Sequence, residues 1–318
     1  MSLLTSYELR AIELMAPLNI QGPITTEWLQ GGLSGSKVIK VNAKEDVYVV
    51  RFWNKQWIEY FCQDLACQII ASNAGYGPKV YLSSEEEGVS VMKYHSFEPL
   101  TNNQMRLEAL STLIKKIHSG PEVPRGVDRN SYSNSIINEV KETKIVNFAL
   151  IKEVKDRIFS ILKKEARLVT CHRDLHHGNL IYSKGRFLAI DYTWAGMDDP
   201  YVDLANISIF HCTNLKEEEL LLQLYLERQP ILSEIAKLNL MKQLVKIFYG
   251  LEFFSIAMPN IKADPCEITK TSNSYKSFGI NSSSLQAKEF LHYAISMLGE
   301  VIEYSQTERY KMDLKSCK

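Results

Sequence analysis

The sequence predicts an α+β protein of two lobes, a small first lobe with a mixed sheet and one helix and a larger second lobe that is mainly helical. Strand patterns gather in residues 1–95, and helical periodicity dominates residues 96–318. The chain has 318 residues, 45% of them apolar, which is enough material for two packed lobes. We therefore predict that the lobes meet at residues 95 and 96.

The first lobe opens with a short helix and continues into a hairpin. Thr5 and Glu8 have the spacing of a capping box, and apolar residues follow at helical intervals. Residues 31–41 (GGLSGSKVIKV) and 46–53 (DVYVVRFW) place apolar and β-branched residues around a glycine-rich bend and a polar turn. This pattern is typical of a β-hairpin.

A helix and two further strands complete the first lobe. Apolar residues fall on one helical face from Ile58 to Ile70, and Gly75 and the Gly77-Pro78 pair end the helix. Residues 79–82 and 89–92 have the pattern of extended segments. Together with the hairpin, they predict the small sheet.

The second lobe is helical with one exception. A helical pattern runs from Thr101 to His118, and strand patterns are rare after it. Residues 179–183 and 187–191 nevertheless predict two short strands around the Lys184-Gly185 turn. A hairpin inside a helical half of the chain needs a functional reason.

Two later segments bear on packing. Residues 238–258 form the longest apolar region, but Lys242, Lys246 and Glu252 interrupt it, so we expect a core helix rather than a membrane span. Residues 262–284 are rich in Ser, Asn, Thr and Lys, which predicts an exposed or mobile loop.

Charge and cysteine usage restrict the function classes. Lys plus Arg and Asp plus Glu both total 37, so no overall field indicates a nucleic-acid or membrane-surface partner. The six cysteines form no CxxC pair, and no N-terminal segment has the form of a signal peptide. We expect reduced thiols in a cytoplasmic protein.

Four polar residues with metal and acid–base chemistry lie within a stretch of twenty residues: His172, Asp174, Asn179 and Asp191. The predicted hairpin brings Asn179 and Asp191 side by side. Two hard oxygen ligands, with space for water and phosphate oxygens, suit Mg²⁺. Asp174 is then free to orient an acceptor hydroxyl and receive its proton during phosphoryl transfer.

The motif H-x-D-x4-N, followed by a strand that ends in Asp, resembles the catalytic and metal loops of the protein-kinase-like superfamily. The next residues, DYTWAGMDDPYVDLAN, contain no D-F-G motif, and no A-P-E motif follows. They are similar instead to the aminoglycoside phosphotransferase and choline kinase branch. The similarity is greatest to bacterial choline and ethanolamine kinases, whose AGMxDPxxDLAN pattern matches residues 195–206.

The resemblance implies a kinase-like fold and a role for each polar residue of the motif. It makes Asp174 the catalytic base, Asn179 and Asp191 the Mg²⁺ ligands, and Asp203 a structural acid that braces the catalytic loop, which His172 would orient. Asp64 stands where the family has a glutamate that pairs with a basic residue, here Arg51. The implied ATP site, in a nucleotide-binding lobe of residues 1–95, comprises Gly32, Ser34, Gly35, Ser36, Arg51, Asp64, Met92 and Tyr94.

The acceptor is expected to be a small cationic alcohol. Aromatic faces and a nearby carboxylate hold quaternary ammonium groups, and the resemblance places Trp194, Tyr249, Glu252 and Phe253 at the acceptor, with His176 on the substrate side of the loop. Either Glu252 or Phe253 replaces the second tryptophan of the family. Choline is favoured, and ethanolamine, thiamine and an aminoglycoside stay open because an acid also suits a primary amine.

The sequence allows two other interpretations of these residues, an inactive nucleotide-binding protein and a zinc site. A pseudokinase that binds nucleotide without catalysis is motivated by Asp64, although Asp174, Asn179 and Asp191 are intact. A zinc cluster of His172, His176 and His177 lacks the usual ligand spacings. His118 is interpreted as a hydrogen-bonded core histidine. The sequence leaves the oligomeric state and nucleotide preference open.

Overall fold

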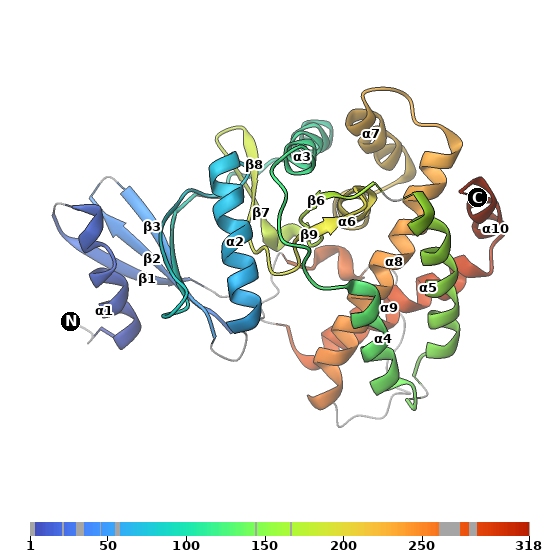
Figure 1. Ribbon diagram of the computed structural model, residues 1–318, viewed down its shortest axis with the longest axis horizontal. Coiled ribbons are helices and arrows are strands. Elements are labelled where there is room, and N and C mark those ends of the chain that lie inside the picture. Colours follow the sequence, from blue (N-terminus) through green and yellow to red (C-terminus); the bar gives the residue numbers. More distant parts are fainter. Residues whose placement is uncertain are drawn as a thin grey trace.

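The computed structural model describes residues 4–20, 22–29, 35–44, 46–54, 58–143, 145–165, 167–260, 274–279 and 285–317. A sheet lies at one end of the molecule and a group of helices at the other, with the N-terminus beside the sheet and the C-terminus among the helices (Figure 1). The capping box predicted at Thr5 and Glu8 is present and begins helix α1 (Ser6–Glu13).

The sheet has five strands in the order β1-β2-β3-β5-β4, and every neighbouring pair is antiparallel, where the sequence predicted a mixed sheet. The outer strand β1 was not predicted, because it alternates between exposed and half-buried residues and has no fully buried face. Helix α2 (Ile58–Ala74) follows β3 as predicted. The strands are β1 (Ile24–Leu29), β2 (Lys37–Ala43), β3 (Asp46–Phe52), β4 (Val80–Ser84) and β5 (Val89–Lys93).

The first half has its own hydrophobic core. Ile39, Val41, Val50 and Val91 of the sheet are fully buried against Ala11 and neighbouring residues of α1. Burial at alternate positions of β2 fits the period of two that strands impose. The predicted division at residues 95 and 96 stays a prediction, and the last strand of the sheet ends at Lys93.

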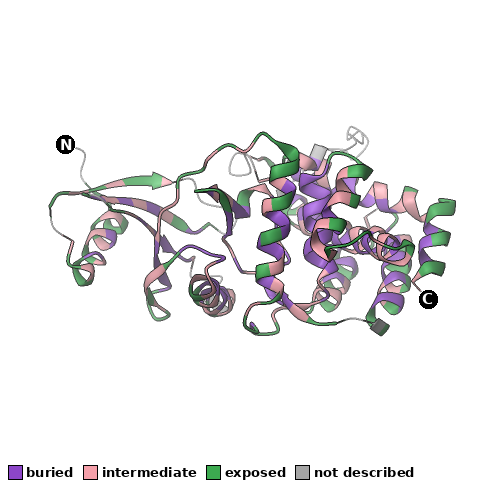
Figure 2. Cartoon of the chain, turned by 90° about the horizontal axis from the view of Figure 1, so that it is seen from above, coloured by how far each residue is buried: buried purple, intermediate pink, exposed green. Residues whose placement is uncertain are grey.

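After the sheet, the described residues form mainly helices, with two small pairs of strands among them. In Figure 2, buried positions gather where the helices face one another and exposed positions lie on the outside. No helix among the described residues is long and apolar enough to cross a membrane. The helices are α3 (Asn103–His118), α4 (Arg129–Val140), α5 (Phe148–Leu162), α6 (Tyr201–His211), α7 (Leu215–Leu226), α8 (Leu232–Ala257), α9 (Ala287–Ser305) and α10 (Glu308–Ser316).

Helix α8 is the core helix predicted from residues 238–258. Its buried residues lie on all sides, because α4, α5, α6, α9 and α10 pack around it. Lys242 and Lys246 are accommodated by ion pairs, each 2.6–2.7 Å long, with Glu218 and Glu300. The two lysines that argued against a membrane span are therefore paired at the edge of a protein core.

The predicted hairpin forms from β7 (Leu180–Ser183) and β8 (Arg186–Ala189), with Lys184 and Gly185 both at positive φ in the turn. A second pair joins β6 (Val169–Cys171) to β9 (Gly196–Asp198). Most of the predicted loop 262–284 lies outside the described residues. Its described part, residues 274–279, contradicts the prediction of exposure, since Tyr275 and Phe278 are buried against the helical core.

Candidate active site

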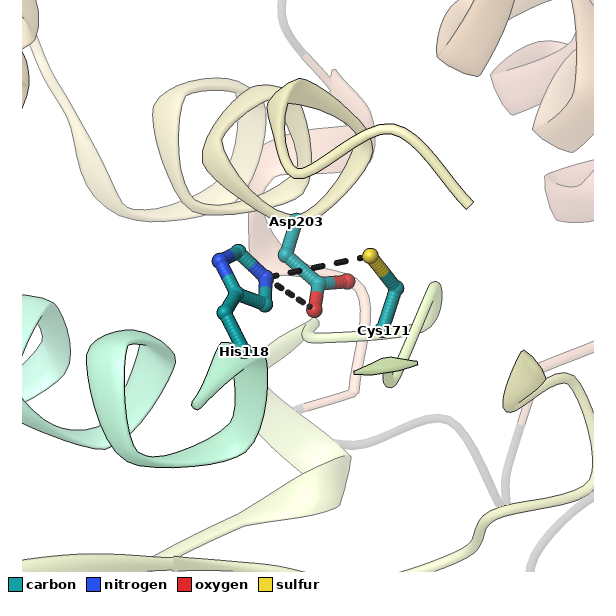
Figure 3. Close-up of side chains that lie close together, drawn as sticks. All are labelled: His118, Cys171 and Asp203. Carbon is teal, nitrogen blue, oxygen red and sulfur yellow. Dashed lines mark hydrogen bonds and ion pairs between the residues drawn. The ribbon is translucent and has the colours of Figure 1, made fainter. Parts of the chain in front are cut away.

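The loop that follows β6 is held by one buried carboxylate. Asp203 of α6 accepts hydrogen bonds from the backbone N–H groups of His172 (2.9 Å) and Arg173 (2.6 Å). A third contact comes from His118 Nε2 of α3, at 3.1 Å (Figure 3). Arg173 has a φ of 66°, a conformation that costs a non-glycine residue energy and that these bonds stabilise.

The ionised form of Asp203 is favoured. Burial alone would raise the pKa of this carboxyl, but the hydrogen bond and charge of His118 hold its pKa below the usual range. His118 is thus the hydrogen-bonded histidine predicted from the sequence, with Tyr225 Oη 2.9 Å from its other ring nitrogen.

His118, Cys171 and Asp203 also have their ligand atoms within 4.8 Å of one another, a spacing that could suit a metal ion (Figure 3). The chemistry argues against one. The oxygen and nitrogen atoms already have partners in the protein, since His118 Nε2 lies 3.1 Å from Asp203, whose two oxygens also accept from backbone N–H groups. We therefore interpret the cluster as a brace for the loop.

Asp174 lies at the tip of this loop and is held at both carboxylate oxygens. Asn179 Nδ2 donates to Oδ2 at 2.8 Å, and the Tyr249 hydroxyl of α8 donates to Oδ1. Burial, followed by the charge of Asp174, raises the pKa of Tyr249 well above its usual value, so the phenol remains a donor. The Tyr249 oxygen also lies 2.8 Å from Asn206 Oδ1.

His176 is the third group beside Asp174. Its Nδ1 accepts from the backbone N–H of Gly178 at 3.0 Å, so the proton of the neutral ring is on Nε2, which lies 3.8 Å from Asp174 Oδ1. Burial lowers the pKa of His176, which keeps the ring neutral near pH 7. The ring packs against Phe278, with 4.6 Å between centroids.

Asp191 is brought to the same place by the hairpin and by a φ of 62°. Thr193 Oγ1 donates to its Oδ1 at 2.7 Å, and Arg51 Nη2 lies 3.3 Å from its Oδ2. Burial opposes its ionisation, but the charge of Arg51, the hydrogen bonds from Thr193 and the charge of His172 together lower the pKa of Asp191. With Asn179 and Asp174 in the same cavity, Asp191 completes a set of hard oxygen donors of the kind that Mg²⁺ prefers.

Arg51 joins the sheet to the hairpin. Its guanidinium lies between Asp64 of α2 and Asp191, 3.3 Å from an oxygen of each, and stacks on Trp53 at 4.2 Å. Asp64 also accepts from the backbone N–H of Tyr192 at 2.5 Å. Burial raises the pKa of Asp64 to about 7, although Arg51 opposes this shift.

None of the described residues predicted for the nucleotide lines the cavity that holds Asp174, although Arg51 and Asp64 reach Asp191 at its edge through ion pairs. Gly32 and Ser34 lie outside the described residues. Gly35, Ser36, Met92 and Tyr94 are described, and none of them lines the cavity that holds Asp174. Met92 lies on β5. Tyr94 comes directly after this strand, and its backbone N–H donates to the carbonyl of Val47 at 3.0 Å.

The cavity has a volume of about 310 Å³ and a largely aromatic wall. Trp194, Tyr249, Glu252 and Phe253 line it as the resemblance implied, and His176 lies beside them. Five aromatic lining residues were not predicted, since they come from elements distant in the sequence. These are Trp53, Tyr60, Tyr132, Phe248 and Phe278. Phe248 alone had a local signal, because it opens the aromatic segment that contains Tyr249.

Glu252 is the second carboxylate of this cavity. Its Oε1 is buried and has no hydrogen-bond partner among the described residues. Burial raises the pKa of Glu252 to about 7, opposed by a hydrogen bond from Tyr132 and supported by the charge of Asp174. Trp194 and Tyr132 meet edge to face at 5.2 Å, so the acid lies among rings.

Comparison with known proteins places this fold and site in a family. The sequence profile of the phosphotransferase enzyme family (APH) matches residues 26–226, more than half of the chain. The chain belongs to the phosphotransferase enzyme family, and the resemblance drawn from its motifs is confirmed.

Solved structures confirm the kinase-like α+β fold. A choline/ethanolamine kinase family protein from Mesorhizobium loti superimposes with a TM-score of 0.74 at 19% identity, covering 99% of both chains. The choline kinase LicA from Streptococcus pneumoniae gives a TM-score of 0.67 at 19% identity, over 93% of this chain and 100% of that one.

A relative with higher sequence identity matches a shorter part of the chain. An uncharacterized protein of Mycoplasma pneumoniae is 29% identical over 118 residues. That match spans 35% of this chain and 38% of the length of the relative.

Proposed function

We propose that this protein transfers the γ-phosphoryl group of ATP, with Mg²⁺, to the hydroxyl of a small cationic amino alcohol. One observation carries the proposal: a catalytic-type carboxylate, Asp174, and a second carboxylate, Glu252, line the same aromatic cavity. The first can receive the proton of a hydroxyl and the second can attract a cation. A molecule that bears both groups fits between them.

Asp174 is the proposed base. Tyr249 and Asn179 each donate to one of its oxygens, which fixes the carboxylate plane in the cavity. An acceptor hydroxyl placed against this carboxylate can pass its proton to it as the oxygen attacks phosphorus. The brace at Asp203 and the carbonyl of Ile190, 3.1 Å from His172 Nε2, hold the loop in register with the hairpin.

Asn179 and Asp191 are the proposed Mg²⁺ ligands, with Arg51 beside the phosphates. The metal would neutralise charge on the transferred phosphoryl group. Arg51 contacts Asp191 directly, so it is positioned to balance the negative charge of the site. We assign nucleotide binding to residues 1–95, which carry Arg51 and Asp64, and the acceptor to residues 96–318.

Choline is the acceptor favoured by the sequence, and the aromatic wall supports a quaternary ammonium group. The printed names of two structural neighbours, a choline/ethanolamine kinase family protein and a choline kinase, also support it. A primary ammonium such as ethanolamine is the second candidate. It is favoured by Glu252, whose unpaired Oε1 can accept an N–H hydrogen bond that choline cannot donate.

The test is ADP release with choline, ethanolamine, thiamine and kanamycin, each with and without Mg²⁺. We expect Mg²⁺-dependent turnover with choline or ethanolamine. Tight ATP binding without turnover on any acceptor would instead support the pseudokinase. Turnover with kanamycin alone would keep the phosphotransferase chemistry and reject the amino-alcohol assignment.

A further inference from the structure

A second cavity lies behind the acceptor cavity, between α4, α5, α8 and the turn after β9. Its volume is about 470 Å³, larger than that of the cavity around Asp174. Among the described residues, Phe248 is the only one that lines both cavities. The motif residues assigned to the reaction do not line the rear cavity, so it is a separate space.

The rear cavity has an apolar wall and a basic wall. The apolar wall includes Leu168 at the surface, which is 55% exposed. The other apolar lining residues are Val127, Phe159, Leu162, Met197, Val202, Met241, Leu244, Val245 and Phe248. The basic lining residues are Arg125, Arg129, Lys155, Lys163 and Arg173.

Each acidic residue of the cavity already has a partner. Asp198 lies 3.4 Å from Arg173, and Asp199 lies 2.7 Å from Lys237. Asp128 caps helix α4 and accepts from the Ser131 hydroxyl at 2.7 Å. The lining is therefore left with more positive than negative charge.

Burial lowers the pKa of Arg129 and the charge of Asp198 opposes this shift, but Arg129 forms no ion pair with a described residue. Its guanidinium stacks on the Phe248 ring at 3.8 Å, and no described carboxylate lies within salt-bridge distance of it. Its Nη2 is buried and has no hydrogen-bond partner among the described residues. The side chain is half-buried, and a buried donor without a partner is costly, so the arrangement is explained best if an anion supplies the missing partner.

We propose that the rear cavity binds a small amphipathic anion, a carboxylate or phosphate attached to an apolar group, with the anionic group at Arg129. Lys155 already donates to Asn130 and Asp156, and the Arg173 Nη atoms donate to the carbonyls of Arg125 and Val127. Arg129 is consequently the main free donor of the interior. The apolar group of the ligand would pack against the apolar wall of the cavity, between Leu244 and Leu168.

The direct test is titration calorimetry of the full chain with octanoate and with octyl phosphate. Either ligand should bind saturably at one site per chain, and the comparison shows which anionic group is preferred. Inorganic phosphate should bind at least about tenfold more weakly, because it lacks the apolar group. Octylamine should not compete. Absence of saturable binding by both anions, or equal binding of octylamine, would overturn the proposal.

Two variants locate the site. Arg129→Gln should weaken anion binding about tenfold or more, since it removes the buried charge partner. Leu168→Glu places a negative charge at the exposed mouth without disturbing the core and should weaken binding about threefold. Leu215→Glu, at a leucine that is 71% exposed on α7, is the matched control and should bind like the parent. Unchanged binding in both cavity variants would show that the anion binds elsewhere.

A linked effect on catalysis rests on the proposed function. Arg129 stacks on Phe248, which also lines the acceptor cavity, and its charge lowers the pKa of Glu252 and so favours the ionised acid. An anion at Arg129 would cancel this charge and leave less of Glu252 ionised near pH 7, so we expect the acceptor KM to rise about threefold with octanoate while the ATP KM is unchanged. If the anion binds but the acceptor KM does not change, the anion site is supported and only its coupling to the acceptor is rejected.

Discussion

Two acids on neighbouring helices, the fully buried Asp203 on α6 and the half-buried Glu252 on α8, have opposite surroundings. Asp203 accepts from two backbone N–H groups and His118, and its pKa is held below the usual range. Glu252 has one buried oxygen without a partner among the described residues, and burial raises its pKa to about 7. A satisfied acid stabilises the loop, whereas an unsatisfied acid keeps its capacity for a ligand.

Asp174 follows the loop residues that Asp203 holds and shares a cavity with Glu252, and its removal should have the largest effect. Asp174→Ala should lower the turnover number by about 10²- to 10⁴-fold, because the acceptor hydroxyl loses its base. The measurement is steady-state ADP release, with ATP binding followed by calorimetry as the control. ATP affinity near the parental value is expected. Turnover close to that of the parent would show that another group is the base.

Asp203→Asn tests the satisfied acid. The amide nitrogen that replaces one carboxylate oxygen cannot accept a hydrogen bond. At least one of the three groups that Asp203 contacts, the two backbone N–H groups and His118, is therefore left buried without a partner. We expect the free energy of unfolding to fall by about 2–4 kcal/mol in a urea titration, with turnover reduced as the loop loosens. A variant that unfolds at the parental urea concentration would contradict the bracing role.

Glu252→Gln tests the unsatisfied acid, and its effect should fall on the substrate rather than on folding. The acceptor KM should rise about tenfold, since the ammonium loses its counter-charge. The free energy of unfolding should be unchanged or slightly higher, because a costly buried acid is replaced by a neutral group. If the variant were destabilised as strongly as Asp203→Asn, the contrast between the two acids would be lost.

The two acids should also differ in their pH dependence. The Glu252 carboxyl becomes charged as the pH rises through about 7, so the acceptor KM should fall about threefold to tenfold between pH 6 and pH 8. Glu252→Gln should flatten this profile. Burial also raises the pKa of Asp64 to about 7, and because Asp64 belongs to the proposed nucleotide site, the ATP KM measured over the same pH range is the control for its titration. A profile that is identical in the variant would assign the titration to another group.

The same shifts have opposite consequences for stability. Because the folded pKa of Glu252 is raised from 4.5 to about 7, the folded chain holds an extra proton in this window, and this acid makes folding less favourable as the pH rises through it. The pKa of Asp203 is lowered, so its contribution is present above the unfolded pKa and is lost as the pH falls through the folded value. Urea titrations of the two variants from pH 4.5 to 7.5 should therefore diverge, with the Glu252→Gln variant losing less stability than the parent as the pH rises.

The loop chemistry was predictable because its residues are close in sequence. The Lys184-Gly185 turn sets the register of the hairpin, and this short-range geometry carries Asn179 and Asp191 to the same end. The brace was predicted only through the family resemblance, since the contact between α6 and the loop spans about thirty residues, from Arg173 to Asp203. The strand β1 and the buried segment 274–279 were missed because polar composition hid their packing.

The sequence by itself led to the proposed reaction chemistry, through the spacing of Asp174, Asn179 and Asp191, and it indicated which part of the chain forms the sheet. Only the tertiary structure decided which rings surround Glu252, because Tyr132, Phe278 and Trp53 come from separate elements that packing brings together. It alone also decided that Glu252 and Arg129 keep unpaired atoms. Whether a polar group is satisfied depends on partners distant in the chain, and no local pattern records them.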